Sequence, residues 1–384
     1  MKTKYLFLLA CLFCCIIVSC SKDDDGPTDS VTGIPDNSLA GPSPYVNPAE
    51  SNVSIPNVGF TLDEINGQRI VNMNMTGIFD PQTGDWLDLK GTTVSGQNIW
   101  LEIDGVPRSI KTESLGSETK ATKAKALVDL VFLVDNSGSM SEEADLLAAE
   151  IENWSAKLAT MLDLKLGCVG YDDGILSGGM DLGTRENLSA FLNREGYTGT
   201  DRTYYFVGAR AGELETKAEN YSTYGECGGA ALHFADEHFS FRAGANRLYV
   251  NFTDEPNQPG EGHEAFSVES VASQDDWKVW QGTIHTVYSG YVDEEYSWWV
   301  EWEAEKPWLM SDYTGGTTIF APSNFEGVSL ETLPVTGALV NSHSVKFHFT
   351  SDLSTGTHTV KITVLSPDKS VKSVREFTDV NFMK

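Results

Sequence analysis

The sequence predicts an α/β fold with a doubly wound, mostly parallel sheet and helices on both faces, flanked by all-β sandwich segments. Residues 130–134 form an unbroken apolar run, as expected of a strand buried on both faces. Between residues 126 and 336, such runs alternate with stretches of helical periodicity, which indicates crossover helices covering a sheet. Before and after this region, short stretches alternate with period two, which predicts antiparallel β structure.

Residues 1–19 are typical of an export signal rather than of folded structure. Lys2 and Lys4 introduce an apolar run over 5–18, which is short for a membrane span. A small residue then precedes Cys20, and this arrangement resembles the lipobox of bacterial lipoproteins. The resemblance implies cleavage before Cys20 and lipidation of that residue, which would hold the chain on a membrane. The alternative is an ordinary signal peptide with an incidental cysteine.

Residues 20–50 are rich in Asp, Pro, Ser, Gly and Asn and lack periodicity, which predicts a flexible tether. Within them, the Ser-Lys-Asp-Asp-Asp of 21–25 resembles the acidic export signal of surface lipoproteins in Bacteroidetes-type bacteria. That resemblance implies a protein anchored by lipid to the outer membrane and facing the cell exterior. A plain solvated linker would have the same composition.

Two flanking segments, 51–125 and 337–384, have the residue alternation of antiparallel strands. Neither segment is long enough for a comfortable sandwich by itself. We therefore expect both flanks to form one β-sandwich, with the domain of 126–336 inserted between them. The alternative is two separate small β modules. The strands expected in the flanks cover residues 70–75, 99–103, 344–349 and 358–364.

The middle region is expected to alternate strands and helices, with a hairpin turn at Asp173-Gly174. In sheets of this class, ligands bind beyond the carboxyl ends of the strands. The expected strands cover residues 130–134, 164–171, 180–182, 248–252, 283–288 and 317–320. The expected helices cover residues 142–162, 229–239, 264–281 and 296–312.

A group of oxygen-bearing side chains directly follows the first buried strand. Asp135, Ser137 and Ser139 form an Asp-x-Ser-x-Ser pattern at the carboxyl end of that strand, before a helix. One carboxylate and two hydroxyls at alternate positions can converge on one point. Hard cations such as Mg²⁺ take oxygen ligands of this kind. The pattern alone is weak, and its position at a strand end strengthens it.

Three stretches together resemble the von Willebrand factor type A (vWA) domain family. LVFLVDNSGSM, at 130–140, resembles the family's first strand and the start of its metal-ion-dependent adhesion site. NFTDE, at 251–255, resembles the fourth strand, and YTGGT, at 313–317, resembles the turn before the last strand. The resemblance covers about residues 126–336. It implies a divalent metal, with Mg²⁺ favoured over Ca²⁺ or Mn²⁺, surrounded by Asp135, Ser137, Ser139 and Asp254.

One position departs from the family pattern, which usually supplies a Thr ligand three residues before a helix-opening glycine. Gly229 matches that glycine, and Glu226 stands where the Thr is expected. A carboxylate also binds hard cations, so Glu226 is a candidate ligand that adds negative charge. Thr223 and Thr200 are the alternatives if the loop folds differently.

The resemblance implies binding of an extracellular protein or glycan through an open position on the metal. The alternative function is a structural or assembly component of a surface complex, with a purely structural metal. The formal net charge of −28 argues against nucleic acid as a partner, because an acidic surface repels phosphates. The sequence has no His-Glu-x-x-His, no Gly-x-Ser-x-Gly and no phosphate loop, so we do not expect an enzyme.

Two further features concern cysteine and tryptophan. Cys168 and Cys227 could pair in an oxidising compartment, and a disulfide between them is one hypothesis. A tryptophan-rich stretch is expected to pack helices onto the sheet, with a sugar-stacking surface as the alternative. These tryptophans are Trp277, Trp280, Trp298, Trp299, Trp302 and Trp308.

Overall fold

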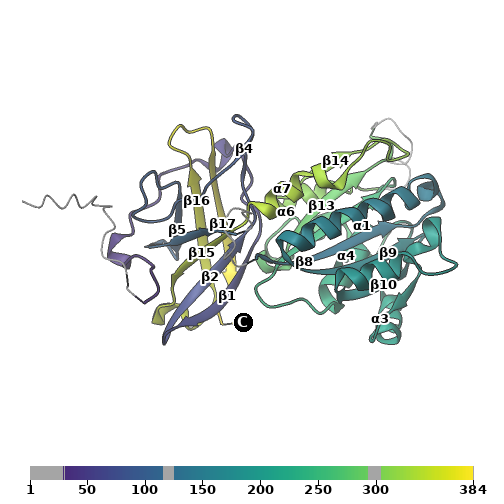
Figure 1. The fold of residues 1–384 in the computed structure, drawn as a ribbon, viewed down its shortest axis with the longest axis horizontal. Coiled ribbons are helices and arrows are strands. Elements are labelled where there is room, and N and C mark those ends of the chain that lie inside the picture. Colours follow the sequence, from purple (N-terminus) through teal and green to yellow (C-terminus); the bar gives the residue numbers. More distant parts are fainter. Residues whose placement is uncertain (1–28, 30, 116–124, 293–303, 384) are drawn as a thin grey trace, which may run out of the picture.

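The computed structural model of the chain describes residues 29, 31–115, 125–292 and 304–383. These residues form an α/β part and a β-sandwich part that lie side by side (Figure 1). Within the described residues, no helix is both long and apolar enough to cross a membrane. The proposed signal segment and Cys20 lie outside them, so the expectations for an export signal and a lipid anchor stay predictions.

The α/β part is built on a seven-stranded sheet in the order β11-β10-β9-β8-β12-β13-β14. Neighbouring strands are parallel except for β9 and β10, which form an antiparallel hairpin through the predicted Asp173-Gly174 turn. The strands are β8 (Leu127–Asp135), β9 (Asp163–Asp172), β10 (Ile175–Gly183), β11 (Tyr205–Val207), β12 (Asn246–Thr253), β13 (Thr283–Tyr288) and β14 (Thr318–Phe320).

Helices cover both faces of this sheet (Figure 1). Along β8, Phe132 packs into one apolar core and its neighbours Val131 and Leu133 into the other, as the alternation of a strand requires. One face carries α1 (Ala144–Met161), α2 (Arg185–Leu192) and α7 (Pro334–Val340). The other carries α3 (Ala211–Ala218), α4 (Gly228–His238) and α6 (Leu309–Thr314). The predicted α/β class with a mostly parallel sheet is confirmed.

The β-sandwich part consists of two four-stranded antiparallel sheets, β1-β2-β15-β7 and β17-β16-β5-β6, which enclose a separate apolar core. Strands from before and after the α/β part share each sheet, since β15 pairs with β2 and β16 pairs with β5. The strands are β1 (Val58–Ile65), β2 (Gln68–Met75), β5 (Ile99–Ile103), β6 (Val106–Arg108), β7 (Lys111–Ser114), β15 (His343–His348), β16 (His358–Leu365) and β17 (Lys372–Val380). A short hairpin adds β3 (Phe79–Asp80) and β4 (Asp85–Trp86).

The sandwich contacts the amino ends of the α/β strands. Asn74 Nδ2 donates to the carbonyl of Gly244, just before β12, at 2.7 Å. Asn57 Nδ2 donates to the carbonyl of Gly282, just before β13, at 2.6 Å. The carboxyl ends of these parallel strands therefore face away from the sandwich.

The tether expected over 20–50 is wrong for the described part of that range. Ile34 is fully buried, and the Ser109 hydroxyl donates to the carbonyl of Asp36 at 2.7 Å. The Asp and Asn side chains that suggested a flexible linker instead accept hydrogen bonds that start two 3₁₀ turns. These are η1 (Asn37–Leu39) and η2 (Pro48–Glu50).

The helix expected over 264–281 is also wrong. The segment forms three short 3₁₀ turns, η6 (Glu264–Phe266), η7 (Val268–Val271) and η8 (Val279–Gln281). Ser270 Oγ donates to the carbonyl of Ser267, and Ser273 Oγ donates to Asp276, so serine side chains compete with helical backbone bonds. The apolar spacing that suggested a helix still buries Trp277.

The helix expected over 296–312 lies partly outside the described residues, with Trp298, Trp299 and Trp302. The described remainder contains α6, which ends at Gly315 in the left-handed conformation typical of a helix C-terminus. The other 3₁₀ turns are η3 (Gly138–Glu142), η4 (Gly199–Thr203), η5 (Glu219–Tyr221), η9 (Leu330–Thr332) and η10 (Ser351–Leu353).

Candidate functional site

The candidate site lies where the strand order of the α/β sheet reverses. With the short edge strand β11 left aside, the strands numbered along the chain run 3-2-1-4-5-6 across the sheet. The reversal falls between β8 and β12, which are neighbours although several elements separate them in sequence. In open α/β sheets, ligands bind at this switch point, beyond the carboxyl ends of the strands. Asp135 ends β8, and Asp254 directly follows β12.

The loop after β8 folds back on its own carboxylate. Asp135 Oδ1 accepts a hydrogen bond from the backbone N–H of Ser137 at 2.9 Å, which closes a tight turn. The backbone N–H of Asn136 donates to the carbonyl of Tyr171 on β9 at 2.8 Å. These bonds fix the start of η3, and α1 follows it. The sequence pattern of a strand, a polar loop and a helix is thus realised as predicted.

A chain of hydrogen bonds brings the predicted residues together. The hydroxyls of Ser137 and Ser139 lie 2.9 Å apart, and Ser139 Oγ donates to Asp254 Oδ1 at 3.0 Å. Asp135 is 1% exposed and Ser137 is 4% exposed, whereas Ser139 is exposed. The two segments that the sequence placed at separate strand ends therefore meet, with an opening to solvent at Ser139.

Thr253, which the sequence analysis did not single out, anchors the buried carboxylate. Its hydroxyl donates to Asp135 Oδ2 at 2.7 Å, and it accepts from the backbone N–H of Glu255 at 3.0 Å. Thr253 is the last residue of β12 and is 2% exposed. Its position inside the NFTDE stretch, next to Asp254, is the signal that could have identified it.

Glu226 lies in the loop before α4, and Gln258 Nε2 donates to its Oε2 at 3.4 Å. Backbone bonds from Gly225 to Gln258 and from Gln258 back to Glu226 fix this loop. Burial raises the pKa of Glu226, and the charges of Asp173, Asp172 and Asp254 raise it further. Among the described residues, no three His, Cys, Asp or Glu side chains are placed to hold a metal ion together, so Glu226 does not join Asp135 and Asp254 as a third acidic ligand.

The two threonine alternatives differ in their surroundings. The Thr223 hydroxyl donates to the carbonyl of Gly225 at 2.9 Å, within its own loop. Thr200, in η4, lines the same hollow as Asp135 and Asn136. Neighbouring Thr203 donates to Asn136 Oδ1 at 2.6 Å, which ties η4 to the loop after β8. Thr200 therefore lies beside Asp135 and Asn136, whereas Thr223 bonds to the backbone of its own loop.

Glu143, at the start of α1, is a further acidic residue that the sequence analysis did not identify. Its side chain is fully buried, and Oε1 accepts a hydrogen bond from the Ser289 hydroxyl at 2.5 Å. Oε2 has no hydrogen-bond partner among the described residues. Its position four residues after Ser139 was the available signal, but Ser289 directly follows β13 and is far away in sequence.

The carboxyl groups of the site are poorly compensated by positive charge. Burial raises the pKa of Asp135 to about 8, and the charge of Asp254 contributes. Burial, followed by repulsion from Asp254 and Glu226, raises the pKa of Glu255 to about 9. Burial raises the pKa of Glu143 to about 7, again with repulsion from Asp254. A bound cation would reverse this repulsion and favour the ionised forms.

The donor set fits a hard cation. Carboxylates and hydroxyls are oxygen ligands of the kind that Mg²⁺ and Ca²⁺ bind. In the described ranges, no three His, Cys, Asp or Glu side chains form a group that could hold a metal by themselves. A cation would therefore need the hydroxyls of Ser137 and Ser139 as well as the carboxylates of Asp135 and Asp254.

The disulfide hypothesis is wrong, because both cysteines are free. Cys168 lies on β9 in the core beneath α1, whereas Cys227 lies in the core on the other face of the sheet. Cys227 Sγ donates to Asn257 Oδ1 at 3.3 Å. Burial raises the pKa of both thiols, to about 12 for Cys227. The sheet itself separates the two sulfur atoms.

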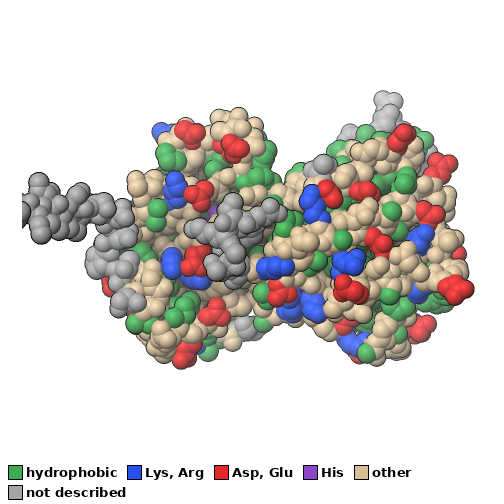
Figure 2. Space-filling model, in the orientation of Figure 1, with side chains coloured by type: hydrophobic (Ala, Val, Ile, Leu, Met, Phe, Trp, Pro, Cys, Tyr) green, Lys and Arg blue, Asp and Glu red, His purple; other side chains and the backbone are tan. Residues whose placement is uncertain are grey.

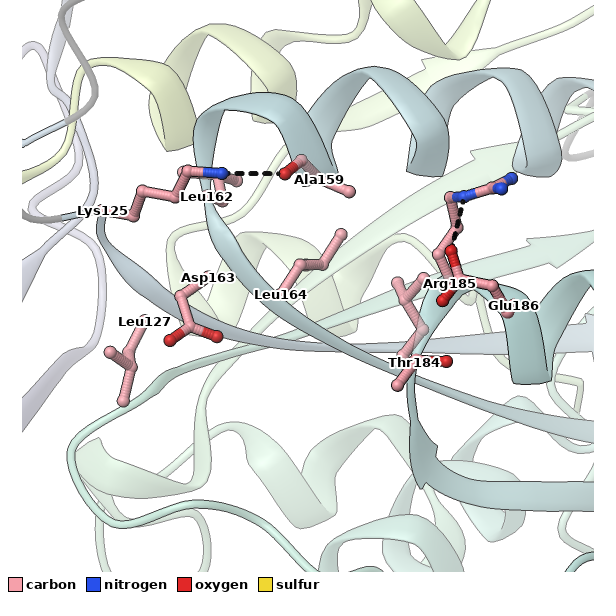
Figure 3. A pocket seen from close by; sticks show the side chains of 10 residues that line it. Lys125, Leu127, Ala159, Leu162, Asp163, Leu164, Thr184, Arg185 and Glu186 are labelled. Atoms are coloured by element: carbon pink, nitrogen blue, oxygen red, sulfur yellow. Dashed lines mark hydrogen bonds and ion pairs between the residues drawn. The ribbon is translucent and has the colours of Figure 1, made fainter. Parts of the chain in front are cut away.

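A pocket of about 640 Å³ lies at the opposite end of the sheet (Figure 3). It is lined by Lys125, which precedes β8, by Asp163, the first residue of β9, and by Thr184, the N-cap of α2. Lys125 Nζ donates to the carbonyl of Ala159 at 3.0 Å. The pocket shares no lining residue with the candidate site.

No protein-family model matches the chain, and no curated protein matches it. Among solved structures, the chain is similar to the crystal structure of the ArnB paralog VWA2 from Sulfolobus acidocaldarius. That likeness has a TM-score of 0.28 and 12% identity, and covers 86% of this chain and 73% of the other. A TM-score of this size is too low to place the chain in a family.

Proposed function

We propose that this protein is a vWA-type binding protein that holds a divalent cation and, through it, an extracellular protein or glycan. The observation that carries the proposal is the hydrogen bond from Ser139 Oγ to Asp254 Oδ1. It joins the Asp-x-Ser-x-Ser loop after β8 to the acidic residue after β12, at the switch point of the sheet. The proposed role is binding and not catalysis.

The residues proposed to hold the cation are Asp135, Ser137, Ser139 and Asp254. When bound, a cation with one open coordination position would accept an oxygen atom of the partner. Mg²⁺ suits the small oxygen-rich site best, and Ca²⁺ or Mn²⁺ are the alternatives. The exposure of Ser139 supports access for a partner, while the buried Asp135 and Thr253 would keep the loop in place.

The proposed setting is the exterior of the outer membrane, with a lipid on Cys20 as the anchor. The arrangement of the two parts is compatible with this setting. Residues 31–50 pack on the sandwich, and the sandwich covers the amino ends of β12 and β13. The candidate site, at the carboxyl ends, would therefore point away from the anchored end of the chain.

A structural role for the cation, in an assembly component of a surface complex, is the second candidate. The burial of Asp135 favours it, because both carboxylate oxygens already accept hydrogen bonds within the protein. A structural ion would tie β8 to β12 and need no open position. The two roles differ in what a mutation removes first, affinity or stability.

The test is a set of thermal melts of residues 21–384 in EDTA and then in Mg²⁺, Ca²⁺ or Mn²⁺. A cation that binds only the folded state raises the melting temperature. We expect a rise that disappears in Asp135→Ala and becomes smaller in the milder Ser139→Ala. Asp63→Ala, at an exposed position on β1, is the matched control. The proposal is wrong if no ion raises the melting temperature of the wild-type chain.

A further inference from the structure

A cavity of about 330 Å³ lies at the interface between the β-sandwich and the α/β part. Its walls come from both parts, with Phe60 on β1 of the sandwich and Trp280 on η8 of the α/β part. Residues 241–245, between α4 and β12, complete it. Small-molecule sites occur preferentially at such interfaces, with volumes from about 300 Å³ upward. The cavity shares no lining residue with the proposed cation site, so its occupancy would not depend on a cation.

Close backbone contacts hold the two walls of this cavity together. Gly244 adopts a φ of +69°, and a Cβ on it would collide with the Thr61 side chain on β1. The carbonyl of Gly244 also accepts the hydrogen bond from Asn74 Nδ2. A Cβ on Gly59 would lie 3.2 Å from the carbonyl oxygen of Ala245. The loop before β12 therefore rests directly on β1, and the cavity is built into the contact between the two parts.

Three aromatic side chains, Phe60, Phe241 and Trp280, give the cavity an apolar lining. Each of them is half-buried. The Phe60 ring packs edge-on against Phe382, with centroids 5.4 Å apart, and the Phe241 ring packs against Tyr249 at 5.9 Å. These contacts support two of the rings from within the protein, while part of each ring stays accessible. A flat apolar group of a ligand can pack against such rings.

The charge of the lining is positive in a chain whose net charge is −28. Among the described residues that line the cavity, the charged side chains are Arg242 and Arg247. Arg242 holds the sheet, because its Nε donates to Asp129 Oδ1 at 2.7 Å and its Nη2 donates to the carbonyls of Val128 and Asp163. On the face seen in Figure 2, Lys and Arg side chains lie in the α/β part close to its boundary with the sandwich, whereas Asp and Glu side chains are frequent toward its far end. A lining of this kind favours a negatively charged ligand.

Arg247 has N–H groups to offer to such a ligand. Its guanidinium lies 4.3 Å from the centre of the Phe241 ring and is 24% exposed. Nη1 donates to Asp236 Oδ1 at 3.2 Å, and among the described residues this is the one hydrogen bond that the guanidinium makes. Asp236 also accepts from the Tyr249 hydroxyl and from Gln281 Nε2. Because a guanidinium carries five N–H groups, the pair with Asp236 leaves most of them for a ligand.

We propose that this cavity binds a small aromatic carboxylate, whose ring packs against the aromatic lining and whose carboxylate pairs with Arg247. Two N–H groups on one edge of a guanidinium match the two oxygens of a carboxylate. A neutral ring would gain the aromatic contacts without the ion pair, and a cationic ring would be repelled by both arginines. Since Phe60 belongs to the sandwich and Arg247 to the α/β part, the ligand would contact both parts at once.

The experiment is isothermal titration calorimetry of residues 21–384 in EDTA, which removes any cation that could itself bind a carboxylate. The probes are benzoate, phenylacetate and indoleacetate, each matched by its neutral primary amide, together with benzylammonium. We expect binding of at least one carboxylate, roughly tenfold weaker binding of its amide, and no binding of benzylammonium. Failure of all three carboxylates, or equal binding of each carboxylate and its amide, would overturn the proposal.

Two variants test the assigned residues. Arg247→Met keeps an unbranched stem over Phe241 and removes the charge, so it should weaken carboxylate binding roughly tenfold and leave amide binding unchanged. Ala243→Trp, at an exposed position of the lining, should fill the cavity and abolish binding of both probes without removing a native contact. Arg185→Met and Ala209→Trp, outside the cavity, are the matched controls. Unchanged carboxylate binding in Ala243→Trp would place the ligand elsewhere and overturn the proposal, even if Arg247→Met does not fold.

Discussion

The hydroxyl of Ser139 donates a hydrogen bond to Asp254 Oδ1 at 3.0 Å, although 115 positions separate the two residues in sequence. Ser139 is exposed, and Asp254 is only partly buried. Their contact joins the loop after β8 to the end of β12. Burial raises the pKa of Asp254, and the hydrogen bond from Ser139 lowers it by less than burial raises it. Changing one residue of this pair therefore tests whether the two segments hold a cation together.

Ser139→Ala should reduce the stabilisation by the cation while leaving the cation-free protein nearly unchanged. The exposed hydroxyl contributes little to folding, so we expect a change below about 0.5 kcal/mol in EDTA. Loss of one ligand should weaken cation binding, measured by isothermal titration calorimetry with Mg²⁺. Ser38→Ala on η1 is a control at a distant site. Equal cation affinity in wild type and Ser139→Ala would contradict the assignment of this ligand.

Thr253→Val should destabilise the protein even without a cation. The substitution keeps the shape of the side chain but removes the hydroxyl that donates to Asp135 Oδ2. Leaving a buried carboxylate oxygen without its donor costs about 1–3 kcal/mol. Urea unfolding in EDTA measures this loss. Thr61→Val, whose hydroxyl makes a longer 3.4 Å bond in the sandwich, should cost less. A loss at Thr253 no larger than at Thr61 would show that this bond does not hold Asp135.

Glu143→Gln should stabilise the cation-free protein, and the gain should depend on pH. The folded pKa of Glu143 is raised to about 7, above its ordinary value of 4.5. Its neutral form therefore favours folding below pH 4.5, and this contribution is lost as the pH rises through 7. The difference between variant and wild type should grow over that window by at most about 1.4 kcal/mol per pH unit and then level off.

Urea unfolding at several pH values in EDTA measures the effect of Glu143→Gln, since glutamine can still accept the hydrogen bond from Ser289. Glu64→Gln, at an exposed position on β1, is the matched control. A constant difference between Glu143→Gln and wild type from pH 4 to pH 8 would show that Glu143 does not titrate in this range.

Reducing agents should leave the folded protein unchanged. Cys168 and Cys227 lie in different cores, and both are buried. We expect residues 21–384 to show no mobility shift on reduction. The two thiols should react with a thiol reagent only after unfolding, because thiolates are the reactive form and burial opposes their formation. A single reduction-sensitive band would indicate a bond that the described arrangement does not allow.

The strand ends that carry the site could be predicted from local sequence. The apolar run of β8, the polar motif from Asp135 to Ser139, and Asp254 after β12 occur in the order that a parallel sheet requires. Parallel strands have their carboxyl ends at the same edge of a sheet, so the order of these motifs is enough to predict that the residues lie at one edge. The helix periodicity of α1 and α4 was equally local, and both helices lie within two residues of their expected bounds.

Other features could not be predicted, because local side-chain bonds or contacts between distant segments replaced the structure that the apolar pattern favoured. The serines of 267–273 bond locally and replace the expected helix with 3₁₀ turns, although the apolar spacing resembled a helix. Ile34 is buried only because the sandwich offers it a surface. Tyr205 carries no local signal of its left-handed backbone, which the close approach to Gly178 accommodates.

The sequence by itself determined the α/β class, the order of the strand ends and the positions of the candidate oxygen-bearing side chains, because periodicity and motif order are local properties. The tertiary structure alone decided that Thr253 holds Asp135, that Ser289 meets Glu143, and that the sheet separates Cys168 from Cys227. Each of these depends on which strands become neighbours and which face a side chain takes. Residues far apart in the chain come into contact only when the strands have paired and the two apolar cores have formed on the two faces of the sheet.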